Sequence, residues 1–199
     1  KMEYLICTVF WEMMEAFTYI RKKEKINITF DQNQVSSSNQ IKYEGKTSYN
    51  INIDKNQNPE SWVWDYNKNE IYLETIPISI ILGHELIHAQ HFLENTNSQI
   101  NNAENYFFDK RFNSVQKDTN GKIGSQEEYK TVGIGFTKEE AEKQEKFGLR
   151  NDDGSIRVTG KYNNSGDITE NMLRLELGLP LRLNYYRRIY IEQKSNIKK

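Results

Sequence analysis

The sequence has few of the residues that would cross-link a fold or carry it through a membrane. Its one cysteine in 199 residues, Cys7, excludes a disulfide within the chain. Cys7 lies in an apolar segment, where a buried structural thiol is favoured over a nucleophile. The longest apolar runs, residues 5–11 and 76–82, fall far short of the roughly 20 residues that a membrane helix needs. We therefore expect a soluble protein without a membrane partner.

An excess of charge of either sign is also absent. The chain has 27 basic and 28 acidic residues, so a general attraction to nucleic acid is not expected. Hydrophobic residues make up 36% of the chain, which is enough for one substantial core at this length. We expect a monomer with one domain over residues 1–199, in which residues 194–199 form a solvated tail.

Histidine is scarce, and all three histidines fall in residues 78–94, ISIILGHELIHAQHFLE. His84, Glu85 and His88 follow the order H-E-x-x-H. On a helix, side chains four residues apart share a face, so the two imidazoles can bind one ion. A catalytic zinc takes nitrogen and carboxylate ligands and leaves one position to water. Glu85 is placed to take a proton from that water and pass it to a leaving amine. The motif predicts a zinc peptidase with one Zn2+.

A chance match is the alternative, because the motif fixes only three residues in five. The apolar residues around the motif are Ile76, Ile78, Ile80, Ile81, Leu82, Leu86, Ile87, Ala89, Phe92 and Leu93. A helix with so many apolar positions is typically buried. Histidines buried in it would lose water unless they gained polar partners, and an ion is one such partner. We therefore favour zinc ligation over a chance match.

Hydrophobic periodicity predicts an α+β fold in which a small sheet packs against the helix of the motif. The expected strands are residues 26–30, 48–54, 70–74 and 155–162. The strands at 48–54 and 70–74 are expected in one hairpin or meander, after a polar loop at 31–40. The expected helices are residues 4–21, 78–95, 138–147 and 168–177, with a further helix capped by Ser125. Residues 95–102 are expected to form a loop, and residues 103–116 have no assignment.

A catalytic zinc needs a third protein ligand from further along the chain. His91 shares the face of His84 and His88, but a continuing helix lifts it about 5 Å past His88, so packing or a substrate contact is the better prediction for it. A carboxylate remains. Glu104 and Glu128 are the candidates, since Glu127 cannot point the same way as Glu128 if both are helical.

Two tracts resemble the clostridial neurotoxin light chains. HELIHAQH at residues 84–91 and EEYKTVG at residues 127–133 are similar to their motifs HELIHAGH and EELRTFG. In those proteases the second glutamate of the pair ligates zinc, which implies Glu128 here. They also carry a later glutamate that holds a zinc-ligating histidine, and an arginine and a tyrosine that polarise the scissile carbonyl. Glu170, Arg182 and Tyr185 reproduce the spacing of these three residues.

The tract ENMLRLELGLPLR at residues 170–182 resembles still more closely the NleD-type bacterial type III effector metalloproteases. This resemblance implies a zincin-like fold and a gluzincin-like zinc endopeptidase, secreted by a bacterium and acting in the host cell cytoplasm. Its best known members cut MAP kinases of the JNK and p38 group, so a host signalling protein is the expected partner. A glutamate that fixes an imidazole tautomer, and a cation and a phenol that stabilise an oxyanion, suit such a reaction.

Two other functions are consistent with the sequence. The first is a protease toxin that acts on a different host protein or on competing bacteria. The second is a degenerate zincin that binds a host partner without cutting it. The intact motif disfavours the second function, because loss of Glu85 would be the expected mark of degeneration.

Overall fold

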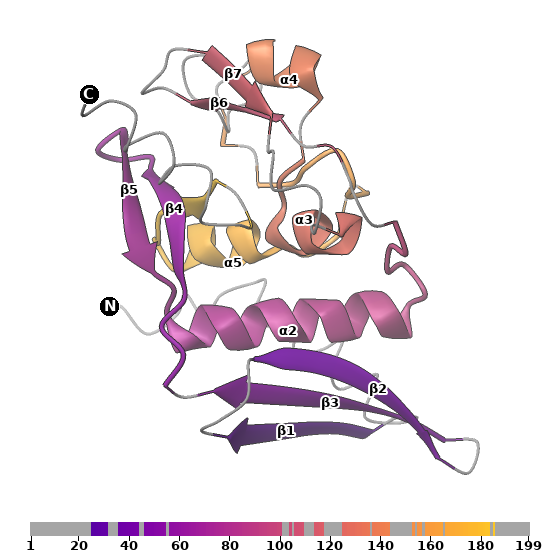
Figure 1. Ribbon diagram of the computed structural model, residues 1–199. Coiled ribbons are helices and arrows are strands. Elements are labelled where there is room, and N and C mark those ends of the chain that lie inside the picture. The colour runs from indigo at the N-terminus through magenta and orange to yellow at the C-terminus, as the bar shows by residue number, and fades with distance from the viewer. Residues whose placement is uncertain are drawn as a thin grey trace, which may run out of the picture. The chain divides into compact units, whose positions relative to one another are not determined.

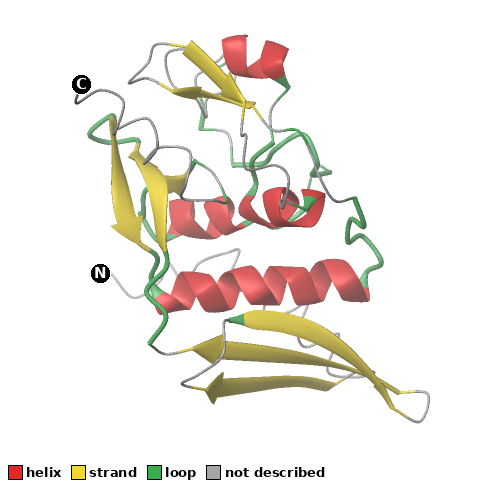
Figure 2. Cartoon of the chain, viewed as in Figure 1, coloured by secondary structure: helices red, strands yellow, loops and turns green. Residues whose placement is uncertain are grey.

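The computed structural model describes a large part of the chain, and all structural statements below concern that part. The described residues are 25–31, 36–43, 46–54, 56–100, 104, 106–109, 114–117, 125–135, 137–143, 153, 155–156, 158–164, 166–183 and 185. The chain divides into two compact units, each made of two segments. The first is Lys1–Pro59 with Ile76–Asn97, and the second is Glu60–Thr75 with Ser98–Lys199. Helices and small sheets are mixed, in agreement with the expected α+β class (Figure 2).

In its described residues, the first unit holds a three-stranded sheet and one long helix. Its strands are β1 (Lys25–Asp31), β2 (Ser37–Tyr43) and β3 (Lys46–Asp54), and the helix is α2 (Ile78–Leu93). The sheet order is β1-β3-β2, with β1 parallel and β2 antiparallel to β3. Figure 1 shows α2 lying along this mixed sheet, where it contacts β2 and β3. The predicted small mixed sheet against the helix of the motif is therefore present.

Alternate residues of β3 form the core beneath α2. Tyr49, Ile51 and Ile53 are all buried, as expected for side chains that share one face of a strand. The ring of Tyr49 lies 5.6 Å from that of Phe92, between centroids. Burying these side chains fixes the position of α2 on the sheet, since each large apolar side chain stabilises the fold by roughly 1.5–3 kcal/mol.

Helix α2 begins and ends close to the predicted residues. Pro77 is its N-cap, with a φ of −59° that suits the first turn, and the carbonyl of Pro77 accepts from the amide of Ile81 at 3.1 Å. The helix ends after Leu93, and Asn95 has a φ of 55°, in the left-handed region that asparagine tolerates. The prediction of a helix over residues 78–95 is confirmed. None of the described helices is long and apolar enough to cross a lipid bilayer.

The second unit has an antiparallel sheet in the order β5-β4-β8. Its strands are β4 (Glu60–Asp65), β5 (Glu70–Thr75) and β8 (Leu181–Arg182). Residues 70–75 therefore form the predicted strand but pair with β4, and the expected hairpin or meander with residues 48–54 is wrong. The physical reason is that nearly all of β4 is buried, so its sequence lacks the alternation that reveals a half-exposed strand.

The other elements that the structure describes in the second unit are one hairpin and three short helices. They are β6 (Tyr106–Asp109), β7 (Ser114–Lys117), α3 (Gln126–Val132), α4 (Lys138–Lys143) and α5 (Glu170–Glu176). Ser125 caps α3 as predicted, because its hydroxyl accepts from the Glu128 amide at 3.3 Å. Thr169 caps α5 in the same way, and Gly178 follows that helix with a φ of 67°.

Two predicted segments differ from the structure. Residues 37–40, expected in a loop, belong to β2, where backbone pairing with β3 makes a strand from polar residues. Residues 155–162 form no strand beyond a single bridge at Ile156 in their described part. The amide of Lys161 bonds to the carbonyl of Gly135 in a turn instead. The expected helix at 4–21, the end of that at 138–147 and the tail at 194–199 lie outside the described residues.

Candidate metal centre

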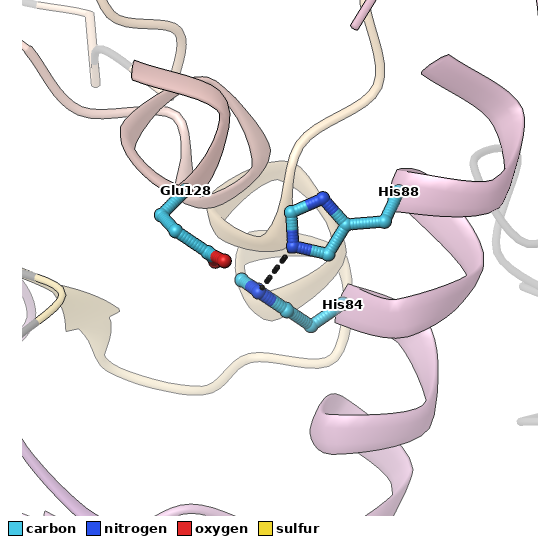
Figure 3. Close-up of side chains that lie close together, drawn as sticks. All are labelled: His84, His88 and Glu128. Carbon is cyan, nitrogen blue, oxygen red and sulfur yellow. Dashed lines mark hydrogen bonds between the residues drawn. The ribbon is translucent and has the colours of Figure 1, made fainter. Parts of the chain in front are cut away.

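Helix α2 places two imidazoles together on one face. His84 and His88 are four residues apart, and their Nε2 atoms lie 3.0 Å from each other. The ring planes stand at 83° with centroids 4.7 Å apart, so the rings meet edge to face (Figure 3). Glu85 follows His84 directly, and both side chains are buried. One turn of a single helix therefore supplies two nitrogen donors and an adjacent carboxylate.

Glu128 in the first turn of α3 supplies an oxygen donor. One ligand atom from each of His84, His88 and Glu128 lies within 4.8 Å of the other two (Figure 3). The backbone amide of Glu128 is held by the Ser125 cap, which fixes the turn that carries the carboxylate. These three residues form a candidate metal centre.

The other two candidate glutamates have different partners. The exposed carboxylate of Glu104 bonds to Lys117, and this hydrogen bond holds the pKa of Glu104 below its usual range. The carboxylate of Glu127 accepts from the Ser98 amide at 2.6 Å. Of Glu104, Glu127 and Glu128, the three glutamates considered for the third ligand, Glu128 is the one that the structure groups with the histidines.

His91 is the most deeply buried histidine, with 2% of its surface exposed. Its carbonyl accepts from the amides of Thr96 and Asn97, which fold the chain back after the end of α2. Within the described residues, His91 is not in the group that could hold an ion. Its position agrees with a packing role.

The donor set of this centre fits zinc. Two imidazole nitrogens and one carboxylate oxygen are the ligands of many catalytic zinc sites, which keep a fourth position for water. Two nitrogens that each lie about 2.0–2.1 Å from a tetrahedral zinc are about 3.3 Å apart. The 3.0 Å between the two Nε2 atoms is close to that value. The two imidazoles therefore have a separation close to that of zinc ligands, and the three residues together have the chemistry of a zinc donor set.

The second unit brings together the other three predicted site residues. Glu170 is fully buried, and its Oε2 accepts from Arg182 Nη1 at 2.8 Å. Arg182 Nη2 donates to the carbonyl of Tyr185 at 2.9 Å, and the guanidinium carbon lies 5.0 Å from the centre of the Tyr185 ring. These contacts join a carboxylate, a cation and a phenol. That Glu170 orients a zinc-ligating histidine stays a prediction.

The ring of Tyr185 packs on the same helix that carries Glu128. Tyr129, Val132 and Ile134 form a buried cluster on and just after α3, and Tyr185 lies against it. Tyr185 is therefore held on one side by this apolar cluster and on the other by Arg182.

Two residues of this network escaped the analysis of the sequence. Arg174 is fully buried, and its Nε donates to Glu170 at 2.8 Å while its Nη1 donates to Glu74 at 3.0 Å. The spacing of four residues between Glu170 and Arg174 on a helix could have revealed the first ion pair. Glu74 is 100 residues from Arg174, and no local pattern links them.

Comparison with known protein families gave a match over most of the chain. The model of the peptidase M91 family, described as effector protein, matches residues 11–185 of the chain. This range contains both histidines of the centre, all of the candidate glutamates and the Arg182–Tyr185 pair. Neither the curated proteins nor the solved structures gave a significant match.

Proposed function

The chain belongs to the peptidase M91 family of effector proteins, and from this premise we propose that it is a zinc-dependent endopeptidase. The observation that carries the proposal is the group formed by His84, His88 and Glu128, which would hold the ion. The description of the family supports a protease that acts as an effector. The proposal further includes that residues 1–199 form one zincin-like catalytic domain that acts as a monomer.

The proposed mechanism assigns the proton transfers to Glu85. When bound, zinc would supply Lewis acidity toward a water molecule and the carbonyl of the scissile peptide. Glu85 would take a proton from the attacking water and deliver it to the amide nitrogen as the peptide bond breaks. Its place directly after His84, with 8% of its surface exposed, puts a carboxylate in a partly dehydrated setting beside the proposed ligands.

Arg182 and Tyr185 would stabilise the negative charge that develops on the carbonyl oxygen. Preorganised donors in a site shielded from water are effective because they need no rearrangement during the reaction. The guanidinium of Arg182 is 7% exposed and bonded to Glu170, which limits its freedom. We also propose that Glu170 orients a zinc ligand, as the neurotoxin resemblance implies.

We propose a host signalling protein as the substrate, with MAP kinases as the first candidates, reached after type III secretion into the host cytoplasm. The effector description of the family supports a host target. A toxin protease with another target would use the same residues, so the experiment must identify the substrate without assuming it.

The test combines metal analysis with identification of new protein termini. The purified protein and its Glu85→Ala variant are loaded with zinc, incubated with host cell lysate, and the new N-termini are read by mass spectrometry. We expect one zinc per chain in both proteins and cleavage only by the unsubstituted one, because Glu85 is the base and not a ligand. His91→Gln is the control, since it changes a histidine of α2 outside the group and should keep its zinc. Cleavage by Glu85→Ala at the normal rate would remove Glu85 as the base.

A further inference from the structure

The side chain of Arg182 is held at each of its three nitrogens. Nη1 donates to Glu170 at 2.8 Å, and Nη2 donates to the carbonyl of Tyr185 at 2.9 Å. The third nitrogen, Nε, donates to the hydroxyl of Ser61 at 3.0 Å. Because a guanidinium is planar, contacts at three of its atoms fix both the position and the tilt of the plane. Ser61 thus fixes Nε, as Glu170 fixes Nη1 and the Tyr185 carbonyl fixes Nη2.

The backbone of Arg182 is held by a side chain that takes the place of a strand. On one edge, β8 lies against β4, and the amide of Leu183 donates to the carbonyl of Trp62 at 2.9 Å. Backbone groups alternate along a strand, so the amide and carbonyl of Arg182 face the other edge. There Asn171 Oδ1 accepts from the Arg182 amide at 2.7 Å, and Asn171 Nδ2 donates to the Arg182 carbonyl at 3.0 Å.

Ser61 and Asn171 are polar residues in buried positions. Both are fully buried, and Ser61 precedes the buried residues Trp62, Val63 and Trp64 of β4. Burying a hydroxyl or an amide costs free energy unless it is hydrogen-bonded. Ser61 bonds to the side chain of Arg182 and Asn171 bonds to its backbone, so both buried residues act on the same arginine.

We propose that Ser61 and Asn171 are positioning residues that fix Arg182 for the stabilisation of the transition state. The inference rests on the proposed function, in which the guanidinium of Arg182 stabilises the oxyanion. A free arginine side chain loses rotamer entropy when it is fixed. The contact with Ser61 restricts the side chain on folding, before the substrate binds, while Asn171 fixes the backbone that carries it, so the cation keeps one orientation.

The test is a double-mutant cycle between Ser61→Ala and Arg182→Ala. The substrate is a fluorogenic peptide that spans the cleavage site found in the lysate experiment. Ser61→Ala should lower kcat by about 10- to 100-fold with little change in KM, because a displaced cation affects mainly the transition state. In the Arg182→Ala background the same substitution should have no further effect, since it acts through Arg182. Asn171→Ala would remove the partner of two buried backbone groups of Arg182 and could therefore destabilise the fold. Its kcat is therefore interpreted only together with that of the milder variant, Ser61→Ala.

A second readout follows the contact without any substrate. In protein labelled with 15N, the Nε–H signal of Arg182 is assigned by its loss in Arg182→Lys, and its hydrogen exchange is measured. We expect slow exchange in the unsubstituted protein and faster exchange by at least about tenfold in Ser61→Ala, because the acceptor is gone. Unchanged exchange would overturn the inference whether or not cleavage is observed.

The two readouts separate failure of the inference from failure of the proposed function. If Arg182→Ala leaves kcat unchanged, Arg182 does not stabilise the transition state. Both this part of the proposed function and the inference about Ser61 and Asn171 are then wrong. If Arg182→Ala lowers kcat but Ser61→Ala does not, only the inference falls. An equal loss from Ser61→Ala in both backgrounds would show a general structural role and would also overturn the inference.

Discussion

Exchanging one atom of Glu128 gives the sharpest test of the metal centre. Glu128→Gln keeps the shape of the side chain but converts its carboxylate into a neutral amide. An amide is a poor ligand for zinc. Loss of a partner that only orients a ligand typically lowers metal affinity 10- to 100-fold. Loss of a direct ligand should therefore exceed about 100-fold, or about 2.7 kcal/mol of binding free energy.

Glu127→Gln provides a matched control one residue away. It makes the same change of charge in the same helical turn, and the amide oxygen of glutamine can still accept from the Ser98 amide, as Glu127 does at 2.6 Å. Glu127 is not in the group that could hold an ion. We expect Glu127→Gln to bind zinc as the unsubstituted protein does.

The assay is a thermal unfolding experiment with buffered zinc. At a free zinc concentration about 1,000 times the Kd, the ion stabilises the folded protein by about 4.1 kcal/mol, and a 100-fold weaker site gains only about 1.4 kcal/mol. For a chain of this length the difference corresponds to roughly 5–10 °C in Tm. The assignment of Glu128 is wrong if Glu128→Gln keeps the full rise in Tm, or if Glu127→Gln loses as much of it.

Two further predictions concern packing and pH. A Cβ on Gly133 would lie 2.2 Å from the Val158 carbonyl oxygen, so Gly133→Ala should cost at least about 2 kcal/mol in urea unfolding. Gly178→Ala is its control and should cost about 1 kcal/mol, since Gly178 also has a positive φ but no described atom near its Cβ position. Burial, and to a smaller extent the Glu104 carboxylate, raise the pKa of Tyr162 to about 12 from an ordinary value of 10.0. The unfolded chain then loses this proton first, so stability should fall as the pH rises from 10 to 12. Tyr162→Phe should flatten that fall in unfolding curves, and an equal fall in both proteins would refute the assignment.

The sequence was sufficient where structure depends on neighbours along the chain. The motif helix was predicted because apolar residues surround His84 and His88 at short spacing, and Pro77 marks its start. The cap of α3 was predicted from a single residue, Ser125, and is equally local. Such features can be predicted because the residues that make their contacts are neighbours along the chain.

The sequence was insufficient where distant segments meet. Strand β4 is nearly continuous in its burial and carries no alternation, so its pairing with both β5 and β8 was not predicted. The polar strand β2 is recognisable only through its partner β3. Arg174 and Glu74 form an ion pair across 100 residues, and charge alone did not distinguish them from surface residues. Each of these contacts joins segments that are distant in the sequence, and hydrophobic periodicity gives no information on which distant segments meet.

The place of β8 in its sheet has a consequence for how the protein acquires activity. Ser61 and Arg182 are 121 residues apart, yet they meet through β4 and β8. Closing so long a loop costs entropy and is slow compared with the winding of a helix. A chain that refolds from denaturant should therefore recover its helical circular dichroism before it recovers cleavage. A chain that is still emerging from the ribosome should stay inactive until the segment that contains β8 is free.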